Sequence, residues 1–339
     1  MHPTSHRCSL IRIACLKDTR QYCGQPLHQM GNYAGEKGER MAYIIENAQI
    51  LKDRQLKTCS FLIQEDRIAA IQSNFKRSSL MKMNLGQFIM TPTYILLNSN
   101  ISQHESFPKL KQLITNQFLL KGCTTFLTYV TLNYEYELHS KVSEMETSLN
   151  SSPIDFLIGV RIPVRMITQS FIRSCKKKKI PAIFVEVQDA TELANIPWSW
   201  IKDAMFPFNS PLIPIISCSE KKEVKLVLSK WKEVMVNEKI PAILEEIEEN
   251  QPLSTAILNK IGIYPYKGSL MNGTELSYNL YDHSIQIGKV EQADLFQYHK
   301  DRLTVTVHRG KIIRSGKVVS FKPGYGEHVK VKTPSYFSI

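Results

Sequence analysis

The chain of 339 residues is 43% hydrophobic and carries a formal net charge of +12. This length allows one large domain or two of ordinary size. No apolar run reaches the ~18 residues that suggest a membrane span, so a soluble protein is expected and a membrane-embedded class is excluded. The seven cysteines are scattered and form no CxxC pair. Scattered cysteines favour reduced thiols in a cytoplasmic protein over a disulfide framework or a zinc ribbon.

The positive charge leaves two interpretations open: a plain basic surface, or a surface that binds an acidic partner or nucleic acid. The densest basic run is Lys176 to Lys179. No aromatic residue or glycine is interleaved with these lysines. A solvated helix end is therefore favoured over a base-stacking platform, and nucleic acid is not the expected partner.

Residues 1–40 show neither helical nor strand periodicity, and they end in a Gly-, Glu- and Lys-rich run just before Met41. Codons for these residues are purine-rich, as is a bacterial ribosome-binding site that precedes a start codon. We therefore predict that residues 1–40 are an N-terminal extension with one of two origins. It is either upstream sequence read in frame with a mis-annotated start, in which case Met41 is the true start, or a real disordered tail. A peptide from before Met41 in the native protein would contradict the first interpretation.

Strand patterns dominate both ends of the chain after Met41. The first end has three predicted strands, with a tight turn at Glu65 and Asp66 between the last two. The strands predicted at the two ends cover residues 43–50, 59–64, 67–71, 276–281, 303–308, 311–313 and 318–319. Short strands joined by charged turns indicate antiparallel β structure at each end.

Between these ends, strands alternate with helices, as in parallel βα units. The predicted strands cover residues 94–98, 124–130, 154–160, 181–187 and 212–216. The predicted helices cover residues 109–120, 220–236, 243–249 and the stretch between Ser254 and Gly262. Ser254 suits an N-cap and Gly262 suits a helix end.

These patterns predict an α/β plus all-β protein with two domains. Residues 42–90 and 264–332 would form a composite β-sandwich, and residues 91–263 a shortened barrel inserted into it. The insert has about 170 residues, fewer than the roughly 200 or more of a full (βα)8 barrel. The open sheet edge must be covered, either by the helix over 220–236 or by a second subunit.

Three segments carry a family resemblance: residues 44–48 with 61–71, residues 262–273, and residues 305–319. In this order they resemble the opening strands, the G-L-Y-P-x-K-G-x-I-x-x-G link and the closing hairpin of the amidohydrolase superfamily, in its dihydroorotase and hydantoinase (dihydropyrimidinase) branch. The resemblance implies a β-sandwich around a TIM-like barrel. It also implies metal-dependent hydrolysis of carbon–nitrogen bonds in cyclic amides, with zinc as cofactor.

The metal motif of that family is degenerate in this chain. The family's P-G-x-I-D-x-H-x-H corresponds to residues 92–100, with Leu96 at the carboxylate position and Asn98 and Asn100 at the two histidine positions. An amide oxygen is a weak, neutral donor that seldom holds catalytic zinc, and without the metal nothing lowers the pKa of an attacking water. We expect no metal and no cofactor, and we keep Asn98 and Asn100 as candidates for binding a polar ligand.

Four other side chains near predicted strand ends are weak site candidates. Glu186 and Asp189 suit either an acid–base pair or a solvated loop. Cys218 suits a nucleophile, but no histidine base is near in sequence, which favours a structural thiol. Arg161 suits either a substrate carboxylate or an ordinary ion pair.

The preferred hypothesis is an amidohydrolase-like pseudoenzyme without metal, with a binding or structural role as a homo-oligomer or beside an active amidohydrolase relative. The first alternative is an active hydrolase of cyclic amides with a rebuilt site. The second is a binder of an acidic partner or nucleic acid through the basic surface. Metal analysis separates the preferred hypothesis from the first alternative.

Overall fold

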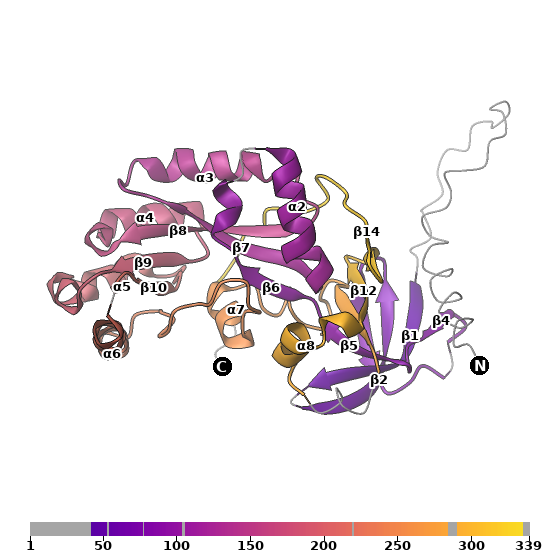
Figure 1. Ribbon diagram of the computed structural model, residues 1–339. Helices are drawn as coiled ribbons and strands as arrows, with labels where there is room; N and C mark the ends of the chain where they lie inside the picture. The colour runs from indigo at the N-terminus through magenta and orange to yellow at the C-terminus, as the bar shows by residue number, and fades with distance from the viewer. Residues whose placement is uncertain are drawn as a thin grey trace, which may run out of the picture.

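The computed structural model describes residues 42–52, 54–76, 78–103, 106–218, 220–283 and 290–334. The predicted N-terminal extension, residues 1–40, lies outside the described residues. The described strands form two sheets, a nine-stranded mixed sheet and a five-stranded parallel sheet. Figure 1 shows the two sheets at opposite ends of the molecule, with most helices gathered around the parallel sheet. No described helix is long and apolar enough to cross a membrane.

Both ends of the chain contribute strands to the mixed sheet. The first end supplies β1 (Ala42–Lys52), β2 (Gln55–Gln64), β3 (Arg67–Gln72), β4 (Met81–Asn84) and β5 (Phe88–Pro92). The second end supplies β11 (Tyr278–Asp282), β12 (Leu303–His308), β13 (Lys311–Ser315) and β14 (Val318–Val319). The order is β14-β13-β12-β11-β5-β1-β2-β3, with β4 paired to β1. The antiparallel pair β5–β11 joins the two halves. The limits of the two predicted domains stay a prediction.

Local sequence explains the mixed sheet well. Alternate residues of β2, such as Phe61 and Ile63, are fully buried in its core, as the period-two pattern predicts. The turn between β2 and β3 lies at Glu65 and Asp66, where the sequence predicts it. The turn between β12 and β13 uses Gly310 at φ 72, a conformation that glycine adopts without steric cost.

The parallel sheet contains the five strands that the sequence predicts. In order across the sheet they are β6 (Tyr94–Leu97), β7 (Cys123–Thr131), β8 (Asp155–Pro163), β9 (Ile183–Val187) and β10 (Leu212–Ile216). The α-helices that follow them are α2 (Phe107–Gln117), α3 (Glu137–Ser148), α4 (Gln169–Lys178), α5 (Trp198–Met205) and α6 (Lys221–Asn237). Later helices are α7 (Thr255–Ile261) and α8 (Gln292–Tyr298), and the short 3-10 helices are η1 (Asn100–Gln103), η2 (Leu119–Lys121), η3 (Val164–Met166), η4 (Ala190–Asn195) and η6 (Lys300–Arg302). Five parallel strands with their helices form a curled, partial TIM-like barrel.

The two faces of the parallel sheet are covered by different parts of the chain. The outer face packs against α2 to α6 in a core that includes Phe126 and Trp231. The inner face is filled by α7, whose Leu258 and Ile261 belong to one buried cluster with Leu127 of β7. Figure 1 shows α7 on the opposite side of the sheet from α2 and α3. The inner face is thus a packed apolar core.

Residues 240–243 cover the free edge of β10. The backbone N–H of Leu212 donates to Pro241 O at 3.0 Å, and that of Ile243 donates to Leu212 O at 2.8 Å. Glu246 extends this contact, since its carboxylate accepts from the backbone N–H of Ile216 at 2.7 Å. The expectation that the helix over 220–236 covers the edge is therefore wrong: this helix, α6, packs on the outer face of the sheet through Trp231.

Residues 250–253 cover the other edge of the sheet, at β6. Asn250 N–H donates to Leu97 O and Leu253 N–H donates to Ile95 O, both at 2.8 Å. The predicted helix over 243–249 is wrong, because these residues have no helical structure. The stretch from 240 to 253 runs from one edge of the parallel sheet to the other. The backbone groups at its two ends form hydrogen bonds with β10 and β6, and not with one another as they would in a helix.

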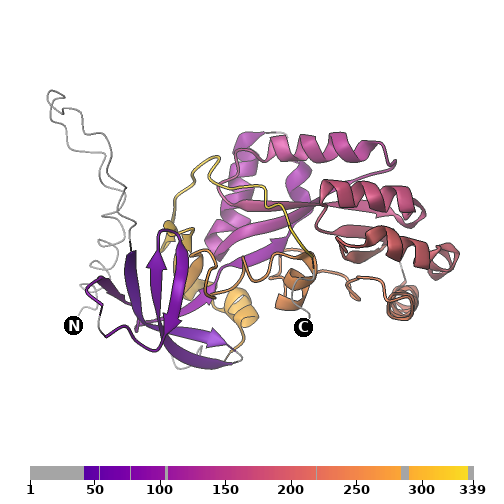
Figure 2. The same cartoon turned by 180° about the vertical axis from the view of Figure 1, so that it is seen from behind.

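A third segment ties the two sheets together. Residues 326–331 follow the mixed sheet in sequence and cross to β8, where Phe156 N–H donates to Glu327 O at 3.0 Å and Val329 N–H donates to Phe156 O at 2.8 Å. Val331 then enters the inner core of the parallel sheet. Figure 2 shows this segment, in yellow, passing from the mixed sheet to the parallel sheet.

Candidate functional site

Asn98 and Asn100 do not form a pair of ligands. Asn98 follows β6 and is 2% exposed. Its Nδ2 donates to Asn250 Oδ1 at 2.7 Å, and its own Oδ1 has no hydrogen-bond partner among the described residues. Asn100 begins η1 and is exposed. Leu96, at the position of the family's carboxylate, is fully buried in the outer core.

Arg161 and Glu186 are brought together at the carboxyl ends of β8 and β9. Arg161 Nη2 lies 3.0 Å from Glu186 Oε2, and Ser217 Oγ donates to Glu186 Oε1 at 2.9 Å. Both ionic side chains are partly buried. Because Glu186 already neutralises Arg161, this arrangement is an internal ion pair with a supporting hydroxyl group.

Asp189 does not join Glu186. It is the N-cap of η4, where its Oδ1 accepts from Thr191 N at 3.0 Å and forms a reciprocal capping box with Glu192. These backbone hydrogen bonds lower the pKa of Asp189 below its ordinary value. Its carboxylate therefore serves the helix end, which is a structural use that its Asp-x-x-Glu spacing could have indicated.

Cys218 is a partly exposed thiol that donates from Sγ to Gln188 O at 2.7 Å. Desolvation, followed by the negative charges of Glu223, Asp189 and Glu192, raises the pKa of Cys218 above its ordinary value. A raised pKa disfavours the thiolate that a nucleophile needs. The surroundings of Cys218 therefore do not activate it.

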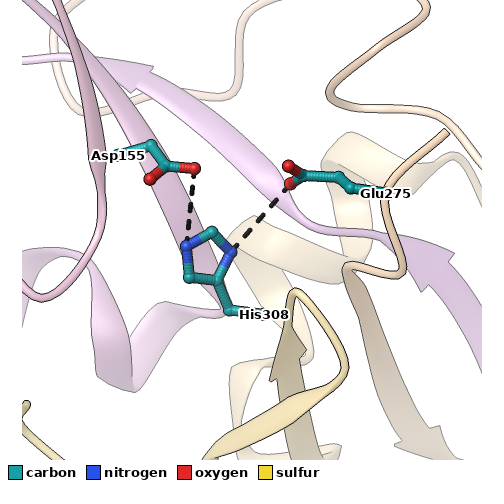
Figure 3. Close-up of side chains that lie close together, drawn as sticks. All are labelled: Asp155, Glu275 and His308. Atoms are coloured by element: carbon teal, nitrogen blue, oxygen red, sulfur yellow. Dashed lines mark ion pairs between the residues drawn. The ribbon is translucent and has the colours of Figure 1, made fainter. Parts of the chain in front are cut away.

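One group of three side chains with metal-binding atoms does converge in the described part of the chain: Asp155, Glu275 and His308. Figure 3 shows that they come from three separate places, the start of β8, the loop before β11 and the end of β12. His308 Nε2 lies 3.4 Å from Asp155 Oδ2, and its Nδ1 lies 4.0 Å from Glu275 Oε1. Asp155 begins β8, so the group lies at the amino end of the parallel sheet.

Lys267 and Arg309 complete this group as an ion network. Lys267 Nζ donates to Asp155 Oδ2 and to Glu275 Oε2, each at 2.6 Å. Arg309 Nη2 donates to Asp155 Oδ1 at 2.7 Å. Burial raises the pKa of Asp155. The hydrogen bond from His308 and the neighbouring positive charges together lower the pKa by more than burial raises it, so the pKa of Asp155 lies below its ordinary value. We call Asp155, Lys267, Glu275, His308 and Arg309 the junction network.

The junction network does not fit a metal ion. The ammonium group of Lys267 lies between the two carboxylates, at the position that a cation would take. A metal there would face that charge at close range. Its role is structural: through Asp155 of β8 and His308 of β12, the network joins the parallel sheet to the mixed sheet. No local pattern in the sequence indicated this network, although Lys267, His308 and Arg309 lie within the segments that carry the family resemblance.

Comparisons with known proteins place the fold. No protein-family model and no curated protein matches this chain. Among solved structures, a dihydropyrimidinase from Brevibacillus agri is 11% identical, with a TM-score of 0.53 over 86% of this chain and 99% of that chain. A D-hydantoinase is 12% identical with a TM-score of 0.58 over the same shares. A prolidase solved with N-methylphosphonate-L-proline is 9% identical, with a TM-score of 0.50 over 81% of this chain and 100% of that chain.

Identities this low establish the fold and no more. The five-stranded parallel sheet and the mixed sheet built from both chain ends match the architecture that the three sequence segments suggest. The chain therefore has a fold similar to that of the solved dihydropyrimidinase and D-hydantoinases, as its sequence resemblance predicts.

Proposed function

We propose that this protein is a pseudoenzyme with a hydantoinase-like fold that acts by binding or by a structural role. The observation that carries the proposal is the state of Asn98. It stands at a ligand position of the resembling family, it offers no nitrogen lone pair, and its amide is buried against Asn250. A catalytic zinc site needs three protein ligands of stronger donor character.

The filling of the inner sheet face also supports this proposal. In a barrel enzyme the substrate enters above the carboxyl ends of the strands. Here Leu253 lies in the inner core with Ile95 and Leu97 of β6, and Asn250 and Leu253 are bonded to that strand. A substrate that approached β6 would have to displace this segment.

A role in partner binding suits the exposed surface at the same end of the sheet. Tyr134 and Tyr136 follow β7, are 59% and 79% exposed, and stack with ring centroids 5.4 Å apart. Exposed tyrosines are enriched in protein interfaces. We propose that the partner is a second copy of this chain or an active amidohydrolase relative. Light scattering of the purified protein, alone and mixed with such a relative, tests this.

Metal analysis with an activity assay tests the proposal directly. Protein purified without chelator is expected to hold no stoichiometric zinc and to leave dihydroorotate and hydantoin unhydrolysed. An active D-hydantoinase, prepared and assayed in parallel, is the positive control. About one metal ion per chain, lost together with hydrolysis on chelation, would overturn the proposal and favour an active hydrolase with a rebuilt site.

The double variant Asn98→His with Asn100→His sharpens this test. Imidazole nitrogen is a far better zinc donor than an amide oxygen, so zinc affinity is expected to rise. The rise is expected to be small, because Asn98 is buried and Asn100 is exposed, so the two positions do not form a pair of ligands. Turnover is expected to stay absent, because Glu186 is paired with Arg161 and Asp189 caps a helix. Recovery of hydrolysis in this variant would show that the remaining strand ends are still competent.

A further inference from the structure

Arg314 is a buried arginine for which the described residues supply no hydrogen-bond or ion-pair partner. It lies on β13, between Thr306 of β12 and Val319 of β14. The residue is 7% exposed. Its Nε and Nη1 atoms are fully buried and have no hydrogen-bond partner among the described residues. Arg309, in the junction network, shows the usual arrangement, since its guanidinium group contacts the carboxylates of Asp155 and Glu327.

The polar groups around Arg314 leave it unpaired because they are bonded to one another. Thr306 Oγ1 donates to Asn279 Oδ1 at 2.9 Å, and Asn279 Nδ2 donates to Gly122 O at 2.9 Å. On the same side of the sheet, the hydroxyl groups of Tyr281 and Tyr94 are 2.9 Å apart. Each of these groups already has a partner that is not Arg314.

None of these neighbours supplies a negative charge. An ionised Tyr281 would stabilise the positive charge of Arg314. Burial, however, raises the pKa of Tyr281 well above its ordinary value, so its phenol stays neutral. A neutral phenol does not balance a guanidinium group. Burial also lowers the pKa of Arg314, yet arginine keeps its proton in proteins. A buried charge without a counter-charge is strongly unfavourable, so this position is suited to an external anion.

We propose that Arg314 is the centre of an oxyanion-binding subsite, which takes the carboxylate or phosphate group of a small molecule at the contact between the two sheets. A guanidinium group matches both anions through paired N–H donors. The subsite is separate from the carboxyl ends of the parallel strands, so it is independent of the proposed loss of hydrolysis.

Thermal unfolding of the full chain tests this proposal. The midpoint is measured in a non-coordinating buffer during separate titrations with sodium phosphate, sodium acetate and sodium chloride at matched ionic strength. A ligand that binds only the folded state raises the midpoint. Phosphate or acetate is expected to raise it by about 2 °C or more beyond chloride. A response to phosphate alone identifies a phosphate group, and a response to acetate alone identifies a carboxylate.

The variant Arg314→Met separates this subsite from other anion effects. It removes the charge and keeps an apolar chain of similar length. Its response to phosphate and acetate is expected to fall to that of chloride, and its midpoint without added anion is expected to equal or exceed that of the unmodified protein. Arg54→Met is the matched control, because Arg54 is exposed and already paired with Glu291. It should retain the full anion response.

Arg314→Lys gives a second measure, since it keeps the charge and loses the planar group. It is expected to fold and to show a weaker anion response. Three results would overturn the proposal. They are an equal response of the unmodified protein to chloride, a full response in Arg314→Met, and a strong destabilisation or loss of folding of Arg314→Met without added anion. The last result would mean that Arg314 has its counter-charge within the chain.

Discussion

At the amino ends of the parallel strands, buried ionic groups from both sheets meet, whereas at the carboxyl ends the ionic groups stay in local, partly exposed pairs. Asp155 is 1% exposed and contacts Lys267 and Arg309, which lie more than a hundred residues further along the chain. Arg161 and Glu186 come from neighbouring strands, with side chains 29% and 24% exposed.

This difference indicates where the molecule uses its charges. In barrel enzymes, residues at the amino ends of the strands contribute to stability and those at the carboxyl ends to chemistry. Here the amino end has the denser, more deeply buried network. The carboxyl end has a helix cap and an ion pair with partners near in sequence, and an amide pair of Asn98 with Asn250 in which Asn98 Oδ1 has no partner among the described residues. The contrast predicts large effects on stability at one end and small effects at the other.

The largest effect is expected for Asp155→Ala. The change leaves Lys267 and Arg309 in a buried site without their shared carboxylate, and breaking a buried pair in this way typically costs about 3–5 kcal/mol. Urea unfolding at neutral pH measures the loss. Glu186→Ala is the matched control at the carboxyl end, with an expected loss of about 1 kcal/mol or less. Equal losses in the two variants would break the comparison.

The second effect concerns acid stability. The pKa of Asp155 is lower in the folded protein than its ordinary value. A carboxyl group of this kind contributes stability that is fully present above its unfolded pKa of about 3.9 and is lost as the pH falls through that value toward the folded pKa. Urea midpoints measured from pH 7 down to pH 3 should therefore decrease most steeply below about pH 4.

Asp155→Asn identifies the source of this acid sensitivity. The amide does not titrate, so the decrease below about pH 4 should be shallower than in the unmodified protein. Asp189→Asn, at the exposed cap of η4, is the control and should leave most of the slope in place. A slope unchanged by Asp155→Asn would assign the acid sensitivity to other carboxyl groups.

A smaller effect is expected at the carboxyl ends. A double-mutant cycle with Arg161→Met and Glu186→Gln should give a coupling free energy of about 0.2–1 kcal/mol, the range of partly exposed ion pairs. Urea unfolding of the four proteins gives this value. A coupling of several kcal/mol would show that the carboxyl end holds its charges as tightly as the junction network does.

The smallest effect is expected for the reactivity of Cys218. Its raised pKa predicts slow alkylation by iodoacetamide at pH 7 and a faster reaction as the pH rises, because the thiolate is the reactive form. Peptide mapping by mass spectrometry isolates this cysteine from the others, and Cys218→Ser is the control. Alkylation at pH 7 faster than that of a free cysteine peptide would indicate an activated thiol at this strand end.

The sequence by itself determined most of the secondary structure, because these signals are local. Strand periodicity located β10 at Leu212–Ile216, and capping residues located α7 between Ser254 and Gly262, where Gly262 has φ 93. Among the predicted elements, the exception is the helix over 243–249, and β4, β5, α3, α4, α5 and α8 were not predicted by range. Residues 241–243 are hydrogen-bonded to β10, and residues 250–253 are hydrogen-bonded to β6. Hydrogen bonds to strands far away in the chain leave no periodic pattern in the local sequence.

At the candidate site, too, some features follow from the sequence alone and others only from the tertiary structure. That Asn98 and Asn100 lack imidazole donors was readable from residue identity and spacing alone. Only the tertiary structure decided that one is buried and the other exposed, and that Asp155 meets Lys267 across 112 residues. It also decided that Arg309 has counter-charges while Arg314 has none among the described residues. The physical reason is that burial and charge pairing depend on which distant segments pack together, whereas propensity and periodicity depend on near neighbours in the chain.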